Sequence, residues 1–239
     1  MDKSPIALTF DSDWINNEHL LELIETLKKN QLKATFFITG KYDCFKKPDP
    51  LFEINPHFRF NGDWTDYEES FKQFRSIAPL SIGIRNHSLY FHERIRVIWQ
   101  NEGIKYSSNN LQPLVENLRP YNITKKIIEI PIYFLDYWFM EFSGPHPKLK
   151  LSSLKLNRPG LKVFDFHPIH LDLNTPNLKY YEKYKHLFSD KLKTQNTHPV
   201  RYEGNGMSTL FQNLIKYITS NKIKTYKLKE IYQKYEKKL

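Results

Sequence analysis

The stretch Ile6-Ala7-Leu8-Thr9-Phe10-Asp11-Ser12-Asp13 decides which fold the sequence predicts. Residues 6–10 form a short, mostly apolar run, which is the pattern of a buried strand. Two carboxylates, Asp11 and Asp13, come directly after it. The stretch therefore predicts a strand that delivers acidic side chains to one end of a sheet.

Short apolar runs of the same kind recur along all 239 residues and alternate with longer helical patterns. No Pro-, Gly- or Ser-rich linker and no internal repeat interrupts them. This alternation is typical of repeated β-α units, so we expect a single α/β domain over residues 1–239. The expected strands are Ile6–Phe10, Ala34–Thr39, Pro50–Ile54, Leu80–Ile84, Ile104–Ser107, Ile127–Ile132, Leu161–Phe166 and Lys222–Tyr226.

Apolar residues at intervals of three and four predict helices between these runs. The first should be capped by Asn16 or Asn17, because a short polar side chain can accept a bond from the first turn. The other expected helices are Tyr67–Ser76, Phe91–Asn101 and Met207–Thr219, of which the last has the clearest apolar face. Two irregular, proline-bearing stretches are expected to be long loops: Ser108–Asn122 and Met140–Pro159.

Composition excludes several classes of protein. Cys44 is the single cysteine, so disulfide scaffolds and thiolate zinc sites are excluded. The 8 glycines form neither a Walker nor a G-x-G-x-x-G pattern, so a nucleotide-cradling loop is not expected. No apolar stretch approaches the roughly 18 residues needed to span a bilayer, and the first residues do not resemble a secretory signal. We therefore expect a cytoplasmic protein.

The net charge of +10 comes in large part from lysines near the C-terminus, which we expect on one face of a terminal helix. A solvated surface is the favoured interpretation, and attraction to an anionic glycan or membrane surface is the alternative. Nucleic-acid binding is not expected. The lysines are Lys222, Lys224, Lys227, Lys229, Lys234, Lys237 and Lys238.

Side chains that can bind a metal recur just after the expected strands. In a parallel β/α barrel the carboxyl ends of the strands share one face, so such residues should converge in one pocket. Each also has a simpler interpretation, since an Asp at a strand end often caps a turn and a lone His is often a hydrogen-bonded polar side chain. The set, which includes one arginine, is Asp11, Asp13, His57, Arg85, His87, His167 and His170.

Carboxylates and imidazoles together suit Zn²⁺, Fe²⁺, Co²⁺, Mn²⁺ or Ni²⁺ and leave room for a water molecule. A metal of this kind can make that water acidic, a carboxylate can take its proton, and a histidine can protonate a leaving group. This chemistry is hydrolysis of an amide or an ester.

Several motifs resemble those of the polysaccharide deacetylase (NodB-homology) family. Thr9-Phe10-Asp11-Ser12-Asp13 is similar to its first motif, Thr-Phe-Asp-Asp-Gly, and Ala34–Gly40 is similar to the strand that usually follows. Glu53-Ile54-Asn55-Pro56-His57 resembles the start of the second motif, Glu-Ile-Gly-Asn-His. The chain resembles most a divergent, WbmS-like branch from lipopolysaccharide O-antigen clusters, through Arg85-Asn86-His87-Ser88-Leu89 and Phe166-His167-Pro168-Ile169-His170 followed by Leu173-Asn174-Thr175.

The resemblance runs from Ile6 to about Ile218 and implies a distorted (β/α)₇ barrel with a divalent metal. It makes Asp11 the base and His167 the general acid. The family's second Asp is a metal ligand, but Ser12 stands there, so Asp13 is expected to replace it. The family's second ligand histidine falls on Asn61, so the ligands are expected to be His57 and, as a substitute, His87.

Three further residues are placed by the resemblance. Arg85 matches the arginine that orients the base. The family's fourth motif is indistinct, with Glu129 and Asp136 as weak candidates.

The leading hypothesis is a metal-dependent hydrolase that removes an N-acyl group, acetyl above all, from a sugar of a bacterial surface polysaccharide or its precursor. A catalytically silent glycan-binding or assembly protein on the same barrel is the rival, supported by the departures at Ser12 and Asn61. A metal hydrolase acting on a phosphoester or on a non-sugar amide is a third alternative.

Overall fold

The computed structural model describes residues 4–59, 67–144, 147–188 and 200–237. Within these ranges the chain forms one sheet of nine strands in the order β6-β7-β5-β4-β3-β2-β1-β9-β8. Every neighbouring pair is parallel except β6 and β7. The strands are β1 (Ile6–Asp11), β2 (Ala34–Ile38), β3 (Phe52–Phe58), β4 (Gly83–Asn86), β5 (Tyr106–Ser107), β6 (Tyr121–Asn122), β7 (Ile128–Glu129), β8 (Phe134–Leu135) and β9 (Lys162–Phe166).

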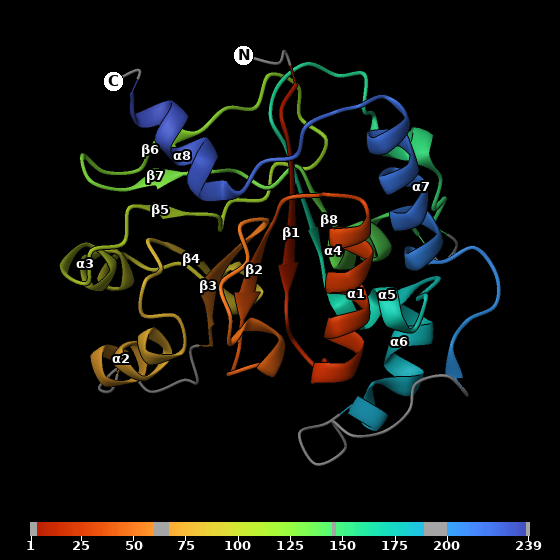
Figure 1. Cartoon of the computed structure of the whole chain (residues 1–239), viewed down its shortest axis with the longest axis horizontal. Coiled ribbons are helices and arrows are strands. Elements are labelled where there is room, and N and C mark those ends of the chain that lie inside the picture. Colours follow the sequence, from red (N-terminus) through yellow and green to blue (C-terminus); the bar gives the residue numbers. More distant parts are fainter. Residues whose placement is uncertain (1–3, 60–66, 145–146, 189–199, 238–239) are drawn as a thin grey trace.

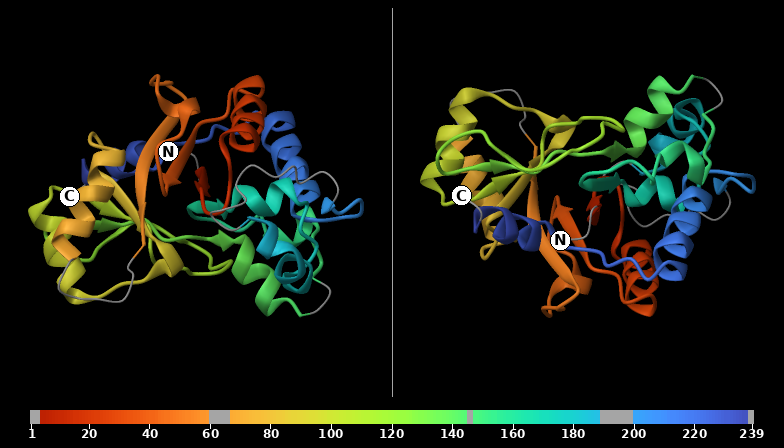
Figure 2. Two further views of the ribbon diagram at one scale, coloured as in Figure 1. Left: turned by 90° about the horizontal axis from the view of Figure 1, so that it is seen from below. Right: turned by 90° about the horizontal axis from the view of Figure 1, so that it is seen from above.

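The sheet curls into an open half-barrel with the longer helices on its outside (Figure 1, Figure 2). This is the fold expected from the sequence, a distorted β/α barrel of the polysaccharide deacetylase type. The helices are α1 (Asn17–Lys29), α2 (Tyr67–Ile77), α3 (Glu93–Asn101), α4 (Asp136–Phe142), α5 (Pro168–Asp172), α6 (Leu178–Tyr184), α7 (Met207–Ser220) and α8 (Leu228–Glu236).

The centre of the sheet is fully buried. All six residues of β1 are buried, because β2 and β9 flank it and helices cover its outer face. The Phe10 ring lies 5.1 Å from that of Phe36 and meets Phe211 of α7 edge-on at 5.7 Å. Burial of such a side chain stabilises the fold by roughly 1.5–3 kcal/mol. This core holds the carboxyl end of β1, and with it Asp11, in place.

The helices agree closely with the sequence prediction. Asn16 caps α1, since its side-chain oxygen accepts a hydrogen bond from the backbone N–H of His19 at 2.9 Å. All apolar residues of the predicted α7 face are buried. The short helices α4, α5 and α6, together with β6 and β8, were not predicted, because elements of two to seven residues give little periodic signal.

Some strand predictions were wrong. β3 extends to Phe58 and β4 to Asn86, so His57 and Arg85 lie inside strands and not beyond them. The expected strand Lys222–Tyr226 is absent from the described residues, where only a single bridge joins Thr225 to Ile6. The expected loop at Met140–Pro159 begins inside α4.

The C-terminal lysines do not share one helical face, contrary to expectation. Only Lys229 and Lys234 lie within α8, and residues five apart on a helix point about 140° away from each other. Lys238 lies outside the described residues. Three of the others precede the helix: Lys222, Lys224 and Lys227. Association of this region with an anionic glycan or a membrane stays a prediction.

The helix α8 covers the amino ends of the strands, at the top of Figure 1. Thr35 of β2 accepts a hydrogen bond from the backbone N–H of Leu228 at 2.9 Å, and Glu53 of β3 accepts one from that of Lys229 at 2.9 Å. These bonds satisfy donors that the first turn of a helix leaves free.

No helix in the described part of the chain combines the length and the apolarity needed to cross a lipid bilayer.

Gly83 lets β4 lie directly against the ring of Tyr106. A Cβ at position 83 would come within 2.1 Å of that ring. The Tyr106 hydroxyl is fixed there, since it donates to Glu53 at 2.7 Å and accepts from Asn55 at 2.7 Å. The close approach of Tyr106 therefore sets the position of β4, which carries Arg85 two residues further on.

Replacement of Gly83 by Ala should lower the free energy of unfolding by about 1–3 kcal/mol, because the added methyl group overpacks the interior. Denaturant unfolding measures this change. Gly40→Ala is the matched control, since a Cβ at position 40 meets no atom within 4 Å, and it should change stability by less than about 0.5 kcal/mol. Equal effects of the two substitutions would show that the contact with Tyr106 does not constrain β4.

Candidate active site

The structure brings all of the predicted catalytic and ligand residues to the carboxyl end of the strands. β1 ends on Asp11, and Asp13 follows it; His57 and Arg85 are paired in register on β3 and β4. The remaining two follow β4 and β9, and are His87 and His167. Asn61 lies outside the described residues.

Asp13, His57 and His87 form a compact cluster in which a potential ligand atom of each lies within 4.8 Å of the others. Oδ2 of Asp13 lies 3.0 Å from Nε2 of His57 and 3.3 Å from Nδ1 of His87. Asp13 and His57 are buried, whereas the His87 side chain is 31% exposed. A carboxylate and two imidazoles at this spacing are a set of ligands suited to a transition metal.

His57 is oriented by the neighbouring strand. Its Nδ1 lies 3.1 Å from the backbone oxygen of Arg85, which can only accept a hydrogen bond, so Nδ1 carries the proton. In the neutral ring Nε2 then offers its lone pair to the cluster. Nε2 is buried and has no hydrogen-bond partner among the described residues, since its approach to Asp13 lacks hydrogen-bond geometry. An unpartnered imidazole nitrogen held in this way fits a metal ligand.

The opposite charges of Asp13 and His57 each favour the ionised form of the other. Burial by itself raises the pKa of Asp13, but the positive charge of His57 and the contact with His87 outweigh burial and hold this pKa well below its usual range. Burial by itself lowers the pKa of His57, but the charges of Asp11 and Asp13 raise it. A metal ion at this site would have to displace the proton from His57, so its binding would weaken as the pH falls.

Ser12 does not take part in the cluster. Its hydroxyl oxygen accepts a hydrogen bond from the backbone N–H of Thr39 at 3.0 Å, which ties the end of β1 to the end of β2. The next carboxylate along the chain, Asp13, lies beside the histidines instead. The geometry agrees with the expectation that Asp13 replaces a carboxylate missing at position 12.

Arg85 holds Asp11 in place beside the cluster. The arginine is fully buried, and its Nη1 donates to Oδ1 of Asp11 at 2.9 Å. The other Asp11 oxygen, Oδ2, lies 3.7 Å from Nε2 of His57, so it faces the cluster. The nearby charge of Asp11 raises the pKa of Arg85 against the opposing effect of its burial, so the guanidinium stays charged.

His167 is fixed by Asp136, one of the two weak candidates from the sequence. One Asp136 oxygen lies 2.8 Å from Nδ1 of His167, and the other accepts the His167 backbone N–H at 2.7 Å. Burial by itself lowers the pKa of His167, but Asp136, with smaller contributions from Asp11 and Asp165, raises it to about 10. His167 is therefore a protonated imidazolium at neutral pH.

The other weak candidate, Glu129, has a structural role. Its carboxylate accepts hydrogen bonds from the Ser107 hydroxyl and from the backbone N–H groups of Asn109 and Asn110. It therefore fixes the turn that follows β5. Sequence reasoning missed Asp165, which lies within β9 and bonds to Arg85, because a single Asp in an apolar strand gives no sign of its distant partner.

His170 lies beside His167, with ring centres 5.6 Å apart. Burial and the charge of His167 lower the pKa of His170 to about 4, against the influence of Asp136, so its ring is neutral. Asp136, His167 and His170 form a second cluster with ligand atoms close together. The Asp136 carboxylate is already committed to His167, so this cluster is a hydrogen-bonded acid pair with a neutral neighbour.

A pocket of about 800 Å³ opens over these residues, and its size is typical of a small-molecule site. Asp11, Asp13, His87 and His167 line it, and most of the other lining residues are aromatic or aliphatic. These include Trp14, Leu89, Leu111, Tyr137, Trp138, Phe142 and Tyr181. Glu182, Lys185 and His186 also belong to the lining.

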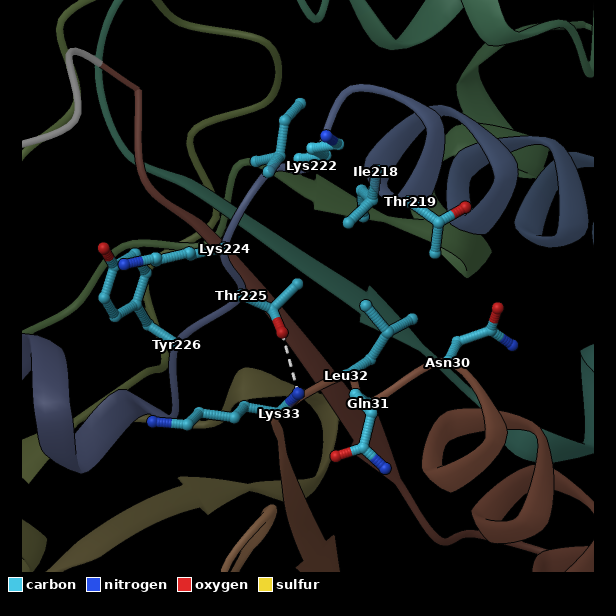
Figure 3. Close-up of a pocket in the computed structure, with 11 residues that line it drawn as sticks. Asn30, Gln31, Leu32, Lys33, Ile218, Thr219, Lys222, Lys224, Thr225 and Tyr226 are labelled. Carbon is cyan, nitrogen blue, oxygen red and sulfur yellow. Dashed lines mark hydrogen bonds between the residues drawn. The ribbon is translucent and has the colours of Figure 1, made fainter.

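A second hollow, of about 540 Å³, lies near the amino ends of the strands and shares no residue with the first. Figure 3 shows it between the ends of α1 and α7, where the backbone N–H of Lys33 donates to the Thr225 hydroxyl at 2.7 Å. Three lysines line it: Lys33, Lys222 and Lys224. Lys33 pairs with Glu230 of α8, and no group suited to catalysis stands out in the lining.

Comparisons with known proteins find relatives of this chain by its sequence and by its fold. A family model of WbmS-like polysaccharide deacetylases matches residues 8–185. Among solved structures, WbmS of Bordetella bronchiseptica, described as a polysaccharide deacetylase involved in O-antigen biosynthesis, is similar at a TM-score of 0.78 and 24% identity, over 89% of this chain and 90% of that one. No curated protein sequence matches the chain.

Two more distant structures share the fold. The peptidoglycan N-acetylglucosamine deacetylase Bc1960 has a TM-score of 0.50 at 13% identity, over 97% of this chain and 89% of that one. A mutant of BA3943 from Bacillus anthracis, described as a CE4 family pseudoenzyme with restored enzymatic activity, has a TM-score of 0.51 at 14% identity, over 97% of this chain and 68% of that one. The family model covers most of the sequence and confirms the resemblance seen in its motifs, so the chain belongs to the WbmS-like polysaccharide deacetylases.

Proposed function

We propose that this chain is a metal-dependent hydrolase that removes an N-acyl group, acetyl above all, from a sugar of a bacterial surface polysaccharide or its precursor. Membership of the family supports an amide hydrolase, and the description of the Bordetella relative points to O-antigen biosynthesis. The observation that carries the proposal is Nε2 of His57, which has no hydrogen-bond partner among the described residues and is held toward Asp13 by the hydrogen bond at Nδ1.

The ion would be held by Asp13, His57 and His87, and the set suits Zn²⁺, Fe²⁺, Co²⁺, Mn²⁺ or Ni²⁺. When bound, such an ion supplies Lewis-acid polarisation of an amide carbonyl. Asp11 acts as the general base in this proposal. Arg85 holds its Oδ1, which leaves Oδ2 on the cluster side to accept a proton from water.

His167 acts as the general acid. Its imidazolium carries a proton at neutral pH, its side chain is 18% exposed, and it lines the same pocket as Asp11 and Asp13. Asp136 fixes the ring through Nδ1, so Nε2–H is the proton that can pass to the departing amine nitrogen. The proposed base, Asp11, is therefore held by Arg85, and the proposed acid, His167, is held by Asp136.

Incubation of the metal-loaded protein with acetylated amino-sugar precursors tests the function, with released acetate as the measurement. Stoichiometric metal with acetate release supports the hydrolase. Glycan binding without acetate release from any acylated amino sugar would contradict it and favour the catalytically silent alternative. The replacement of the family's second Asp by Ser12 is the observation that favours this alternative.

His87→Ala should weaken metal binding by more than the roughly 10–100-fold that loss of an outer-shell partner costs, because it removes a direct ligand. Metal titration of the purified variant measures the change. His92→Asn is a control, since His92 caps α3 outside the pocket and Asn preserves a cap. Unchanged affinity in His87→Ala would show that another group completes the ligand set.

Asp11→Asn and Asp13→Asn should separate the base from the ligand. Asp11→Asn should keep the metal but lower turnover by roughly 10²–10⁴-fold, because only general-base catalysis is removed. Asp13→Asn should lose both metal and turnover. Bound metal and acetate release are measured on both variants, and the opposite pattern would reverse the two roles.

A further inference from the structure

Asp165 shares one guanidinium nitrogen with Asp11. Nη1 of Arg85 lies 2.5 Å from Oδ1 of Asp165 and 2.9 Å from Oδ1 of Asp11. The same nitrogen also donates to the Thr9 hydroxyl at 2.9 Å. Two carboxyl groups therefore face a single cation in a region from which water is excluded, since Arg85 and Asp165 are both 0% exposed.

The second oxygen of Asp165 has no hydrogen-bond partner in the described part of the chain, and it is buried. An ionised carboxylate oxygen without a donor is costly in such a place, whereas a protonated one costs much less. Asp11 differs, because its second oxygen lies at the open pocket beside His57. Of the two carboxyl groups, Asp165 is thus the one whose surroundings favour the neutral form.

We infer that Asp165 is a positioning residue that holds a proton at neutral pH and so leaves the charge of Arg85 to anchor Asp11. Burial raises the pKa of Asp165 to about 8, with Arg85 acting against burial. The charged groups around it are Arg85 of β4, Asp11 of β1, Asp136 of α4, and His167 just after β9. Asp11 and Asp136 disfavour a further negative charge, and Arg85 and His167 favour one.

Ionisation of Asp165 would change the site indirectly, through Arg85 and Asp11. A second full negative charge on Nη1 would compete with Asp11 for the same donor. The anchor that keeps the Oδ2 atom of Asp11 toward the cluster would then weaken. The predicted consequence is a loss of turnover as the pH rises through the pKa of Asp165.

Carbon NMR of protein labelled at the Asp carboxyl carbons tests the protonation state without any substrate or metal. The wild type should show an Asp carboxyl that titrates near pH 8, and Asp165→Asn should lack it. Asp49→Asn is the control, because Asp49 pairs with Lys28 away from the pocket, and it should keep this signal. If the signal lost in Asp165→Asn titrates below about pH 5, near the ordinary range for Asp, the inference is overturned.

The wild-type spectrum decides the matter even if Asp165→Asn fails to fold. Absence of any Asp carboxyl that titrates above about pH 6 would overturn the inference, since ordinary Asp groups titrate near pH 4. Unfolding temperature gives a second readout. The native state holds the Asp165 proton more tightly than the unfolded chain, so the wild type should lose stability relative to Asp165→Asn between about pH 4 and pH 8. A constant difference over that range would contradict the inference.

The kinetic consequence rests on the proposed function and is measured separately. In wild-type enzyme, kcat for acetate release should fall above about pH 8. In Asp165→Asn this fall should move to higher pH, because the amide cannot ionise. An unmoved profile in a folded, metal-loaded variant would show that Asp165 does not act through Asp11. Failure of all acetate release would bear on the proposed function and leave the NMR result standing.

Discussion

The buried guanidinium of Arg85 is the interaction on which the site depends. β4 is separated from β1 by two strands in the sheet, yet Arg85 binds Thr9 and Asp11 of β1 and Asp165 of β9. The side chain therefore crosses the interior of the half-barrel and joins the two sides of its curl. A buried charge is tolerated only when its donors are satisfied, and removal of one partner of such a pair costs about 3–5 kcal/mol. The same contacts that join the two sides of the half-barrel thus place Asp11.

Arg85 also reaches the candidate metal-binding cluster through its backbone. Its carbonyl oxygen receives Nδ1–H of His57, and His87 follows it by two residues. Its remaining donors bond to Ser108 after β5, and the guanidinium stacks on the Phe37 ring at 4.3 Å. A change in the position of β4 would therefore disturb the proposed base and the candidate ligand set together. This coupling explains why Gly83, which lets β4 approach Tyr106, matters for the site.

Much of the fold and of the candidate site could be predicted from the sequence, because both depend on local patterns. Apolar runs located most strands, and parallel topology then required that the residues near their carboxyl ends converge. Asp165 could not be found in this way, because it lies inside an apolar strand and its partners are 80 and 156 residues away. The true length of β3 was missed for a related reason. Asn55-Pro56-His57 interrupts its apolar pattern, because Asn55 bonds to Tyr106 and Ser81 and His57 belongs to the candidate cluster.

Asp13 and His87, the candidate ligands that depart from the family pattern, are each followed by a residue with a strained backbone conformation. Trp14 follows Asp13 with φ 60°, and Ser88 follows His87 with φ 58°. Residues other than glycine seldom adopt this left-handed conformation, and each instance costs about 1–3 kcal/mol unless the surroundings enforce it. Both strained residues adjoin a candidate ligand that stands outside the usual family positions, and both line the pocket. Arg59 lies over the Trp14 ring at 5.3 Å, which helps to hold the turn after Asp13. Two sharp turns therefore direct Asp13 and His87 toward His57. The common family pattern instead has a second Asp at position 12 and a histidine at position 61.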